Sequence, residues 1–372
     1  MMKILILTDE FATGGGAGQV AFLQAMEMAK GNEVTVLTAH GPENSPAGLR
    51  VIKKNLDYHP MFRTVLGIYH PRAIKVLEKF LQNNCFDVCY MHNINVNWSY
   101  RSLKILKDAG VKTILTIHDV TAVTPYVKLC NYNNYKYSWL RELRDAKWFY
   151  NPFRRPLVRK YISLAFEVRA VSRALADFLT TNGIRVDKVE RNRLPQSQSA
   201  PSALYEDTIF FGGRLSTSKG ALLAVEYLAK IREKYKLNPT LLVAGKPGIV
   251  TKKMTELAEK SGVSRQIKFL GWLSQTDYNT RLSTAGMVIV PSICFDSLPT
   301  MILEAMRAGR PVIATNLGGS RELVEEGITG FIADPKDIES FSGKIAAVLQ
   351  DKNSARNLGR KAYGKFINEF AY

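Results

Sequence analysis

The most constraining feature of the sequence is an alternation of short apolar runs with longer amphipathic stretches. The runs are rich in Ile, Val and Leu, which is typical of parallel strands covered by helices on both faces. The first series is expected at Lys3–Thr8, Glu33–Thr38, Phe86–Met91, Lys112–Ile117 and Glu167–Val171. The second is expected at Thr208–Phe211, Thr240–Ala244, Gln266–Leu270, Met287–Val290, Pro311–Ala314 and Gly330–Ile332. The sequence therefore predicts an α/β protein with two Rossmann-like, doubly wound parallel sheets.

A segment rich in Ser, Pro and Gln separates the two series and has no apolar periodicity, as is typical of a linker. The 372 residues also exceed the size at which a single core usually stops growing. We predict one domain at 1–195, a linker at 196–206, a second domain at 207–355 and a last helix at 356–372. Ligands of such sheets bind at the carboxyl ends of the strands, so the domains are expected to face a central cleft.

The charge and the cysteines limit the classes of partner. The formal charge of +18 favours anionic partners, but nucleic acid is not expected because no recognition motif accompanies the charge. No apolar run reaches the roughly 18 residues of a membrane span, and the apolar start is too short for a signal peptide. A cytoplasmic protein, soluble or peripheral on the inner membrane face, is expected.

The four cysteines indicate neither a zinc site nor a disulfide framework, and reduced thiols are expected.

A glycine-rich turn with two cations follows the strand that ends at Phe211. It reads GGRLSTSKG from Gly212 to Gly220 and leads into a helix. Glycines allow close backbone approach to a ligand, and a helix N-terminus favours anions. Arg214 and Lys219 beside it suit a diphosphate. A strand-to-helix turn with two solvated basic residues has the same pattern, and this segment alone does not separate the two interpretations.

A second segment brings carboxylates to a helix start. A strand leads into a loop that carries Asp296, and Pro299 stands at the beginning of the next helix. Such a helix presents free backbone donors near Thr300 and Met301. Asp296 and Glu304 are able to accept hydrogen bonds from sugar and ribose hydroxyls, so the segment suits a glycosylated nucleotide.

Together the two segments resemble glycosyltransferase family 4, the retaining group 1 glycosyl transferases with the two-domain GT-B fold. The resemblance rests on GRLxxxKG at 213–220 followed by Dx7EAMxAGxPVIA at 296–314. Further family landmarks are FLGWL at 269–273, GGSRELV at 318–324 and GITGF at 327–331. The match covers nearly the whole C-terminal domain. It implies that this domain binds a nucleotide sugar, that the N-terminal domain binds the acceptor, and that the last helix returns toward the N-terminal domain.

The resemblance also implies roles for single residues. Arg214 and Lys219 would neutralise the donor diphosphate, Glu304 would hold the ribose, and Asp296 would contact the sugar. The full donor-binding set is predicted as Gly15, Gly16, Arg214, Lys219, Asp296, Leu298, Thr300, Met301 and Glu304, with no metal ligand. One departure is Asp296, where the family commonly has the longer Glu. It leaves the donor base, the sugar and the level of activity open.

The first domain adds a glycine-rich stretch after its first strand. A GxGxxA match begins at Gly16, but no acidic residue follows the second strand, as a dinucleotide site requires. The resemblance instead implies that Gly15 and Gly16 border the donor phosphates and the acceptor; a flexible surface turn is the other interpretation.

His118 directly follows a predicted strand. The resemblance implies a catalytic set of His118 and Asp296, in which His118 orients or stabilises the sugar and the donor phosphate accepts the acceptor proton. The other histidines lack a companion at ligand spacing and are interpreted as structural: His40, His59, His70 and His92.

The region 141–173 holds nine Lys and Arg against three acidic residues, with interleaved aromatic residues. It suits an anionic membrane surface or a solvated basic face that closes over the acceptor.

The expected function is transfer of a hexosyl unit from a UDP- or GDP-linked sugar to a saccharide or lipid-linked acceptor, without metal or cofactor. Cell-surface polysaccharide or glycolipid synthesis is the expected process. The alternatives are a sugar-nucleotide epimerase, a phosphorylase, or a catalytically weak nucleotide-sugar-binding protein.

Overall fold

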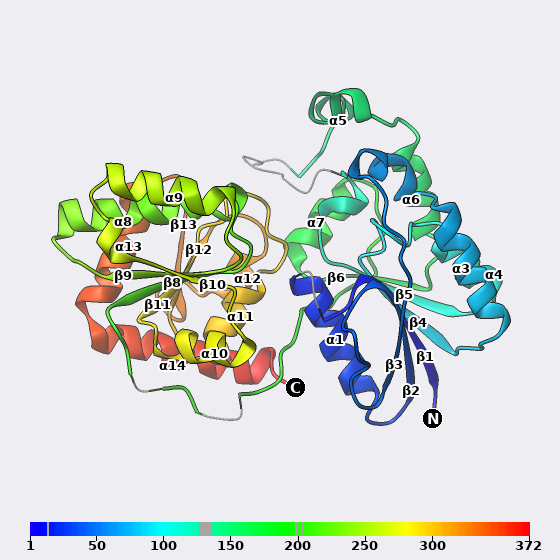
Figure 1. Cartoon of the computed structure of the whole chain (residues 1–372), viewed down its shortest axis with the longest axis horizontal. Helices are drawn as coiled ribbons and strands as arrows, with labels where there is room; N and C mark the ends of the chain where they lie inside the picture. Colours follow the sequence, from blue (N-terminus) through cyan, green and yellow to red (C-terminus); the bar gives the residue numbers. More distant parts are fainter. Residues whose placement is uncertain (13–14, 126–134, 198–199, 203) are drawn as a thin grey trace. The chain divides into compact units, whose positions relative to one another are not determined.

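The computed structural model describes residues 1–12, 15–125, 135–197, 200–202 and 204–372, and these divide into two compact units. The first unit runs to Asn192 and the second begins at Arg193. Each is built on one parallel sheet flanked by helices (Figure 1). The predicted pair of Rossmann-like α/β units is confirmed. The linker limits 196–206, the central cleft and the return of the last helix to the first domain stay predictions.

The sheet of the first unit has seven parallel strands in the order β3-β2-β1-β4-β5-β6-β7. The strands are β1 Lys3–Glu10, β2 Glu33–His40, β3 Leu49–Lys53, β4 Val88–His92, β5 Lys112–Ile117, β6 Glu167–Ala170 and β7 Lys188–Val189. The α-helices are α1 Gly16–Met28, α2 Arg63–Leu66, α3 Pro71–Gln82, α4 Ser102–Asp108, α5 Trp139–Ala146, α6 Arg154–Ile162 and α7 Arg173–Thr181. Short 3-10 turns are η1 Pro60–Phe62, η2 Val120–Ala122 and η3 Lys147–Phe149.

Two strands of this sheet were not predicted from the sequence. β3 and β7 lie at its two edges, where only one neighbouring strand is paired. β7 has two residues, and most of β3 is partly or fully exposed. An edge strand needs no continuous apolar run, because only part of it is buried. The strands that were predicted in this unit are all present.

The sheet of the second unit has six parallel strands in the order β10-β9-β8-β11-β12-β13. The strands are β8 Thr208–Gly212, β9 Thr240–Ala244, β10 Ile267–Gly271, β11 Met287–Val290, β12 Val312–Thr315 and β13 Gly330–Ala333. The helices are η4 Thr217–Lys219, α8 Ala221–Tyr235, α9 Ile249–Lys260, η5 Ser264–Gln266, α10 Gln275–Thr284, α11 Thr300–Arg307, α12 Ser320–Leu323, α13 Ile338–Gln350 and α14 Lys352–Glu369. In Figure 1, α8 and α9 lie on one side of this sheet and α10 and α14 on the other.

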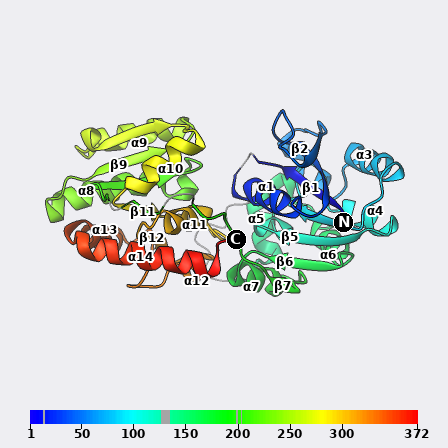
Figure 2. The ribbon, with the colours of Figure 1, turned by 90° about the horizontal axis from the view of Figure 1, so that it is seen from below.

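The core of the second unit explains why its strand predictions hold. Every residue of β11 and β12 is buried, so both strands read as unbroken apolar runs apart from the last threonine. The main apolar cluster joins the sheet to α8 and α13. Helices α13 and α14 lie side by side, as Figure 2 shows. The apolar runs of β11 and β12 are therefore explained by the burial of both faces of the sheet.

Arg310 ties the beginning of the second unit to its sheet. Its side chain is fully buried, and Nη1 donates to the carbonyl oxygens of Leu204 at 2.7 Å and Ala285 at 3.2 Å. Nη2 donates to the carbonyl oxygen of Ser202. The guanidinium also lies 3.8 Å from the centre of the Tyr205 ring. One side chain thus satisfies backbone acceptors from two separate segments.

The expectation of reduced thiols is contradicted at Cys294 and is not tested at Cys130, which lies outside the described residues. Cys294, in the loop after β11, is disulfide-bonded. Cys85 and Cys89 are free, the first exposed and the second buried. A disulfide closed by tertiary structure leaves no local spacing signal, which is why the cysteine pattern did not reveal it.

Candidate functional site

The turn after β8 is shaped by a serine cap and a glycine. The Ser216 side chain accepts a hydrogen bond from the Lys219 backbone nitrogen at 3.3 Å and closes η4. Gly220 then has φ of 79°, and a Cβ there would lie 2.1 Å from the carbonyl oxygen of Pro291. Only glycine permits this approach. Lys219 and the start of α8 are therefore held against the loop that follows β11.

Lys219 and Asp296 form an ion pair at the carboxyl end of the sheet of the second unit. The Asp296 carboxylate also accepts a hydrogen bond from Ser292 Oγ at 3.2 Å, and its backbone oxygen accepts one from the Gly319 nitrogen at 2.8 Å. The side chain of Asp296 is 14% exposed and that of Lys219 is 36% exposed. The structure thus brings the predicted cation and the predicted carboxylate together across 77 residues of sequence.

Helix α11 begins at Thr300, one residue after the predicted start at Pro299, which is its N-cap, and its C-cap Ala308 is directly followed by Gly309. Thr300 and Met301 form its first turn, where backbone N–H groups lack acceptors within the helix. A Cβ on Gly212 would lie 2.7 Å from Met301 Cε, so the end of β8 and the start of α11 lie close together. Leu298, also predicted for the donor site, is 6% exposed and buried before the helix. Its role at a ligand stays a prediction.

Tyr278 is a neighbour of the site that the sequence did not reveal. Its hydroxyl, on α10, donates to Glu304 Oε2 at 2.5 Å and lies 3.2 Å from Met301 Sδ. Burial, and after it the charge of Glu304, raises the pKa of Tyr278 well above its usual value. Tyr278 is therefore a neutral donor that holds the Glu304 carboxylate. The two residues are 26 positions apart, and no motif links them.

Arg214 differs from Lys219 in that no described residue forms a hydrogen bond or an ion pair with its side chain. Its side chain is exposed, and within the described parts of the chain no hydrogen bond or ion pair holds its guanidinium. Gly213 before it has φ of 105° and open space where a Cβ would stand. Arg214 is thus not held in one conformation by the described residues.

In the first unit, two histidines meet at the carboxyl end of the sheet. His92 is the last residue of β4, and His118 directly follows the neighbouring strand β5. His92 Nδ1 lies 2.9 Å from His118 Nε2. The interpretation of His92 as structural rested on spacing along the chain, and this contact in space was not predicted. Parallel pairing of β4 with β5 creates the contact, and spacing along the chain does not show it.

Both imidazoles are neutral at pH 7. Burial, followed by the charge of Arg169, lowers the pKa of His92 to about 4. Burial and the neighbouring His92 ring lower the pKa of His118 well below its usual value. Neutral rings share one proton along the contact, so one nitrogen donates and the other accepts.

Gly15 and Gly16 lie at the start of α1. Gly15 has φ of 127°, a conformation that favours glycine, and nothing lies within 4 Å of an added Cβ. This open helix start is compatible with a bordering ligand and with a surface turn. Thr13 and Gly14, which begin the predicted glycine-rich stretch, lie outside the described residues.

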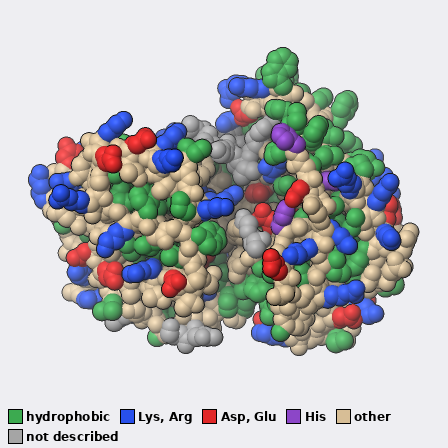
Figure 3. All heavy atoms as spheres, in the orientation of Figure 1, with side chains coloured by type: hydrophobic (Ala, Val, Ile, Leu, Met, Phe, Trp, Pro, Cys, Tyr) green, Lys and Arg blue, Asp and Glu red, His purple; other side chains and the backbone are tan. Residues whose placement is uncertain are grey.

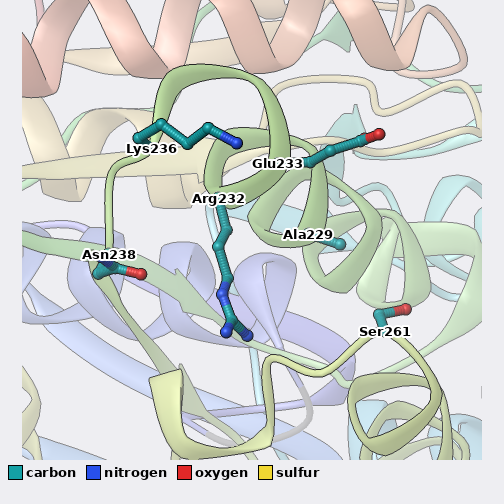
Figure 4. A pocket seen from close by; sticks show the side chains of 6 residues that line it. All are labelled: Ala229, Arg232, Glu233, Lys236, Asn238 and Ser261. Carbon is teal, nitrogen blue, oxygen red and sulfur yellow. The ribbon is translucent and has the colours of Figure 1, made fainter.

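A surface hollow of the second unit is separate from these residues. It is lined by Ala229, Arg232, Glu233, Lys236, Asn238 and Ser261 (Figure 4). Several of these come from the last turns of α8, whereas Lys219 precedes its first turn. A helix of 15 residues is roughly 22 Å long, so the hollow lies far from the Lys219 and Asp296 pair. Among the described residues, no group of three His, Cys, Asp or Glu side chains is arranged to hold a metal ion.

Family models match both units. The model for glycosyl transferases group 1 matches residues 193–365, and the model for a glycosyl transferase 4-like domain matches residues 14–194. The two matches account for nearly the whole chain. The protein therefore belongs to the group 1, family 4-like glycosyltransferases, as the sequence motifs predicted.

Individual relatives are distant. An uncharacterized glycosyltransferase of Methanocaldococcus jannaschii is 30% identical over 39% of this chain and 36% of its own length. The phosphatidyl-myo-inositol mannosyltransferase of Mycobacterium leprae is 22% identical over 91% of this chain and 84% of its own length. The chain spans only 35% to 38% of the length of the first four curated relatives it matches.

A solved structure supports the fold. Anabaena HepE in complex with UDP superposes with a TM-score of 0.71 and 20% identity, over 100% of this chain and 96% of that one. The GT-B fold predicted from the sequence is thereby confirmed.

Proposed function

We propose that this protein is a retaining glycosyltransferase that moves a hexosyl unit from an NDP-sugar to a saccharide or lipid-linked acceptor, in cell-surface polysaccharide or glycolipid synthesis. The observation that carries the proposal is the Lys219–Asp296 pair at the sheet edge where α8 and α11 begin. It places a fixed cation, a carboxylate and two helix N-termini on one unit of a group 1 family member.

Each group has a role that its chemistry suits. Lys219 and Arg214 would neutralise the donor diphosphate, and the free N–H groups of Thr300 and Met301 would donate to its oxygens. Asp296 would accept hydrogen bonds from the sugar hydroxyls. Glu304, one turn into α11, would accept them from the ribose hydroxyls. Gly15 and Gly16 would border the phosphates because they carry no side chain.

The proposed reaction keeps the anomeric configuration. The bond between sugar C1 and the β-phosphate oxygen breaks, and the acceptor oxygen bonds C1 on the same face. The acceptor proton passes to the leaving phosphate oxygen, so no protein base is required. His118 would stabilise the sugar during this step. We propose that no metal or cofactor takes part, since Lys219, Arg214 and helix N-termini supply the positive charge that the leaving diphosphate needs.

A ligand screen followed by product analysis tests the proposal. UDP-sugars come first, because the fold relative HepE was also solved with UDP-glucose, and GDP-sugars come second. Ligands that bind the folded state raise the melting temperature. We expect one NDP-sugar to stabilise the protein. The protein should slowly hydrolyse it to NDP and a sugar of unchanged anomeric configuration. The same hydrolysis is expected in the presence of EDTA, which removes metal ions.

Other outcomes would select the alternatives. Conversion of the nucleotide sugar to an epimer would indicate an epimerase. Dependence on inorganic phosphate would indicate a phosphorylase. Binding without turnover for every donor and acceptor tried would indicate a nucleotide-sugar-binding protein, and inversion of the anomeric carbon would contradict the retaining step.

We further propose that the first unit contacts an anionic membrane through an aromatic–basic surface. Its residues are Trp139, Leu140, Arg144, Lys147, Trp148 and Phe153. Trp148 is 97% exposed and Phe153 69% exposed, and Figure 3 shows hydrophobic and basic side chains together over α5. Tryptophan favours the membrane interface, and basic residues favour anionic headgroups. No helix in the described parts of the chain is long and apolar enough to cross a membrane.

A vesicle assay checks this surface. We expect the double variant Trp148→Ala, Phe153→Ala to bind vesicles that contain anionic phospholipid at least tenfold more weakly in co-sedimentation, because two exposed apolar anchors are lost. The control is Trp272→Ala, which removes a 78% exposed tryptophan from the second unit. Equal loss in both variants, or binding to neutral vesicles as strong as to anionic ones, would contradict the assignment.

A tyrosine variant checks the ribose role of Glu304. We expect Tyr278→Phe to raise the KM for the nucleotide sugar about tenfold and to change kcat less than about twofold, because a hydrogen bond to a charged group contributes about 1.5–3 kcal/mol. Tyr363→Phe on α14 is the matched control. Steady-state NDP release measures both constants, and a fall in kcat at unchanged KM would place Tyr278 in the chemical step instead.

A further inference from the structure

The contact between His92 and His118 has two protonation patterns. In the first, His92 Nδ1–H donates to the lone pair of His118 Nε2, and His118 carries its proton on Nδ1. In the second, His118 Nε2–H donates to His92 Nδ1, and His92 carries its proton on Nε2. The 2.9 Å separation requires one of these, because a neutral imidazole has one donor and one acceptor nitrogen.

The surroundings of His92 select between the patterns. The ring is 1% exposed, and its Nε2 is buried without a hydrogen-bond partner among the described residues. The second pattern would leave a buried N–H without an acceptor. The first leaves only a lone pair there. Orphaned N–H groups are the rarer of the two in folded proteins, so the first pattern is favoured.

We infer that His92 is a positioning residue that holds His118 in the tautomer with its proton on Nδ1, so that His118 presents an N–H donor to the sugar. The inference rests on the proposed function, which places His118 beside the transferred sugar. It goes beyond it by assigning both nitrogens of His118: Nε2 accepts from His92, and Nδ1 donates.

This assignment limits the chemistry of His118. Its Nε2 lone pair is occupied by His92, and its Nδ1 already carries a proton, so neither nitrogen is available as a general base. A neutral donor also adds no positive charge beside a sugar ring that becomes positive as the C1–O bond breaks. The lowered pKa values of both rings agree with this neutral state. The acceptor proton must then leave by another route, which the donor phosphate supplies.

Nitrogen NMR of the full chain tests the tautomer without any ligand. The chain has five histidines, and single substitutions assign their ring signals. We expect His118 Nε2 to show the shift of an unprotonated ring nitrogen and Nδ1 that of a protonated one. The reverse pattern overturns the inference, as does a doubly protonated His118 at pH 7.

Three substitutions at His92 separate the positioning role from a structural one. His92→Asn keeps a donor near the position of Nδ1, His92→Leu removes it, and His92→Asp replaces it with an acceptor. We expect His92→Asp to move the His118 proton to Nε2. Donor turnover should then show kcat about tenfold lower in the Leu and Asp variants, within about threefold in the Asn variant, and KM little changed in all three.

The controls keep the outcomes distinct. His70→Asn removes another buried histidine, whose Nε2 lies 3.1 Å from the carbonyl oxygen of Leu56, and should leave the His118 signals unchanged. Thermal unfolding confirms that each variant is folded. If the wild-type chain turns over no nucleotide sugar, the proposed function fails, while the NMR pattern still decides the tautomer. Equal kcat in the Asn and Leu variants overturns the positioning role.

Discussion

Replacing Lys219 with alanine is expected to lower the rate of NDP release from the nucleotide sugar by about 10²–10³-fold, the usual effect of removing one preorganised stabiliser of developing charge. Lys219 is preorganised because Gly220 fixes the helix start behind it and Asp296 holds its ammonium group. The variant also leaves the Asp296 carboxylate, only 14% exposed, without its cation beside an anionic ligand. Loss of attraction and gain of repulsion act in the same direction.

Arg214 gives the comparison that makes this prediction specific. Its exposed side chain must be ordered when the donor binds, so Arg214→Ala is expected to reduce the same rate only about tenfold. The matched control is Lys361→Ala, which removes one positive charge from an exposed position on α14. The measurement is NDP release under saturating donor. Unchanged rates in both the Lys219 and Arg214 variants would show that the diphosphate binds elsewhere.

Replacing Arg310 with methionine is expected to lower the free energy of unfolding by about 3–5 kcal/mol. Methionine fills a similar volume but donates no hydrogen bond, so the carbonyl oxygens of Ser202, Leu204 and Ala285 lose their donor. The bond to Ala285 is buried and those to Ser202 and Leu204 are partly buried, and a buried acceptor left without a partner costs about 1–3 kcal/mol. The contact with the Tyr205 ring is lost as well.

Urea unfolding followed by circular dichroism measures this effect. Arg360→Met is the control, since Arg360 is exposed and among the described residues bonds only its neighbour Asn357. It should change the free energy of unfolding by less than about 0.5 kcal/mol. Arg310→Lys should not restore stability, because an ammonium group cannot reproduce the planar fork that reaches both segments. A midpoint equal to wild type for Arg310→Met would contradict the bonding described.

The sequence predicted the parts of this fold that depend on continuous burial. β11 and β12 are buried along their whole length, and their apolar runs located them within one or two residues. Helix α11 was located by Pro299 and Gly309, which act through local backbone geometry. β3 and β7 escaped because edge strands have a mixed exposure that resembles a loop.

The site was predictable where a motif carries it and not where tertiary pairing creates it. Lys219, Asp296 and Glu304 belong to segments with recognisable spacing, and the structure brings Lys219 and Asp296 into contact. Tyr278 and His92 have no such spacing. Each gains its partner only when α10 packs near α11 or when β4 pairs with β5. No residue spacing along the sequence indicates that Tyr278 contacts Glu304 or that His92 contacts His118.

Under the proposed function, the pairing of Lys219 with Asp296 also determines which anions the site retains. A free anion, such as inorganic phosphate, satisfies the lysine but leaves an aspartate next to a second negative charge. A nucleotide sugar offers phosphate to the cation and hydroxyls to the carboxylate at the same time. After transfer, the departing NDP has lost those hydroxyls and faces the carboxylate alone. Under the proposed function, Asp296 therefore stabilises the bound nucleotide sugar before transfer and speeds the dissociation of the NDP product after it.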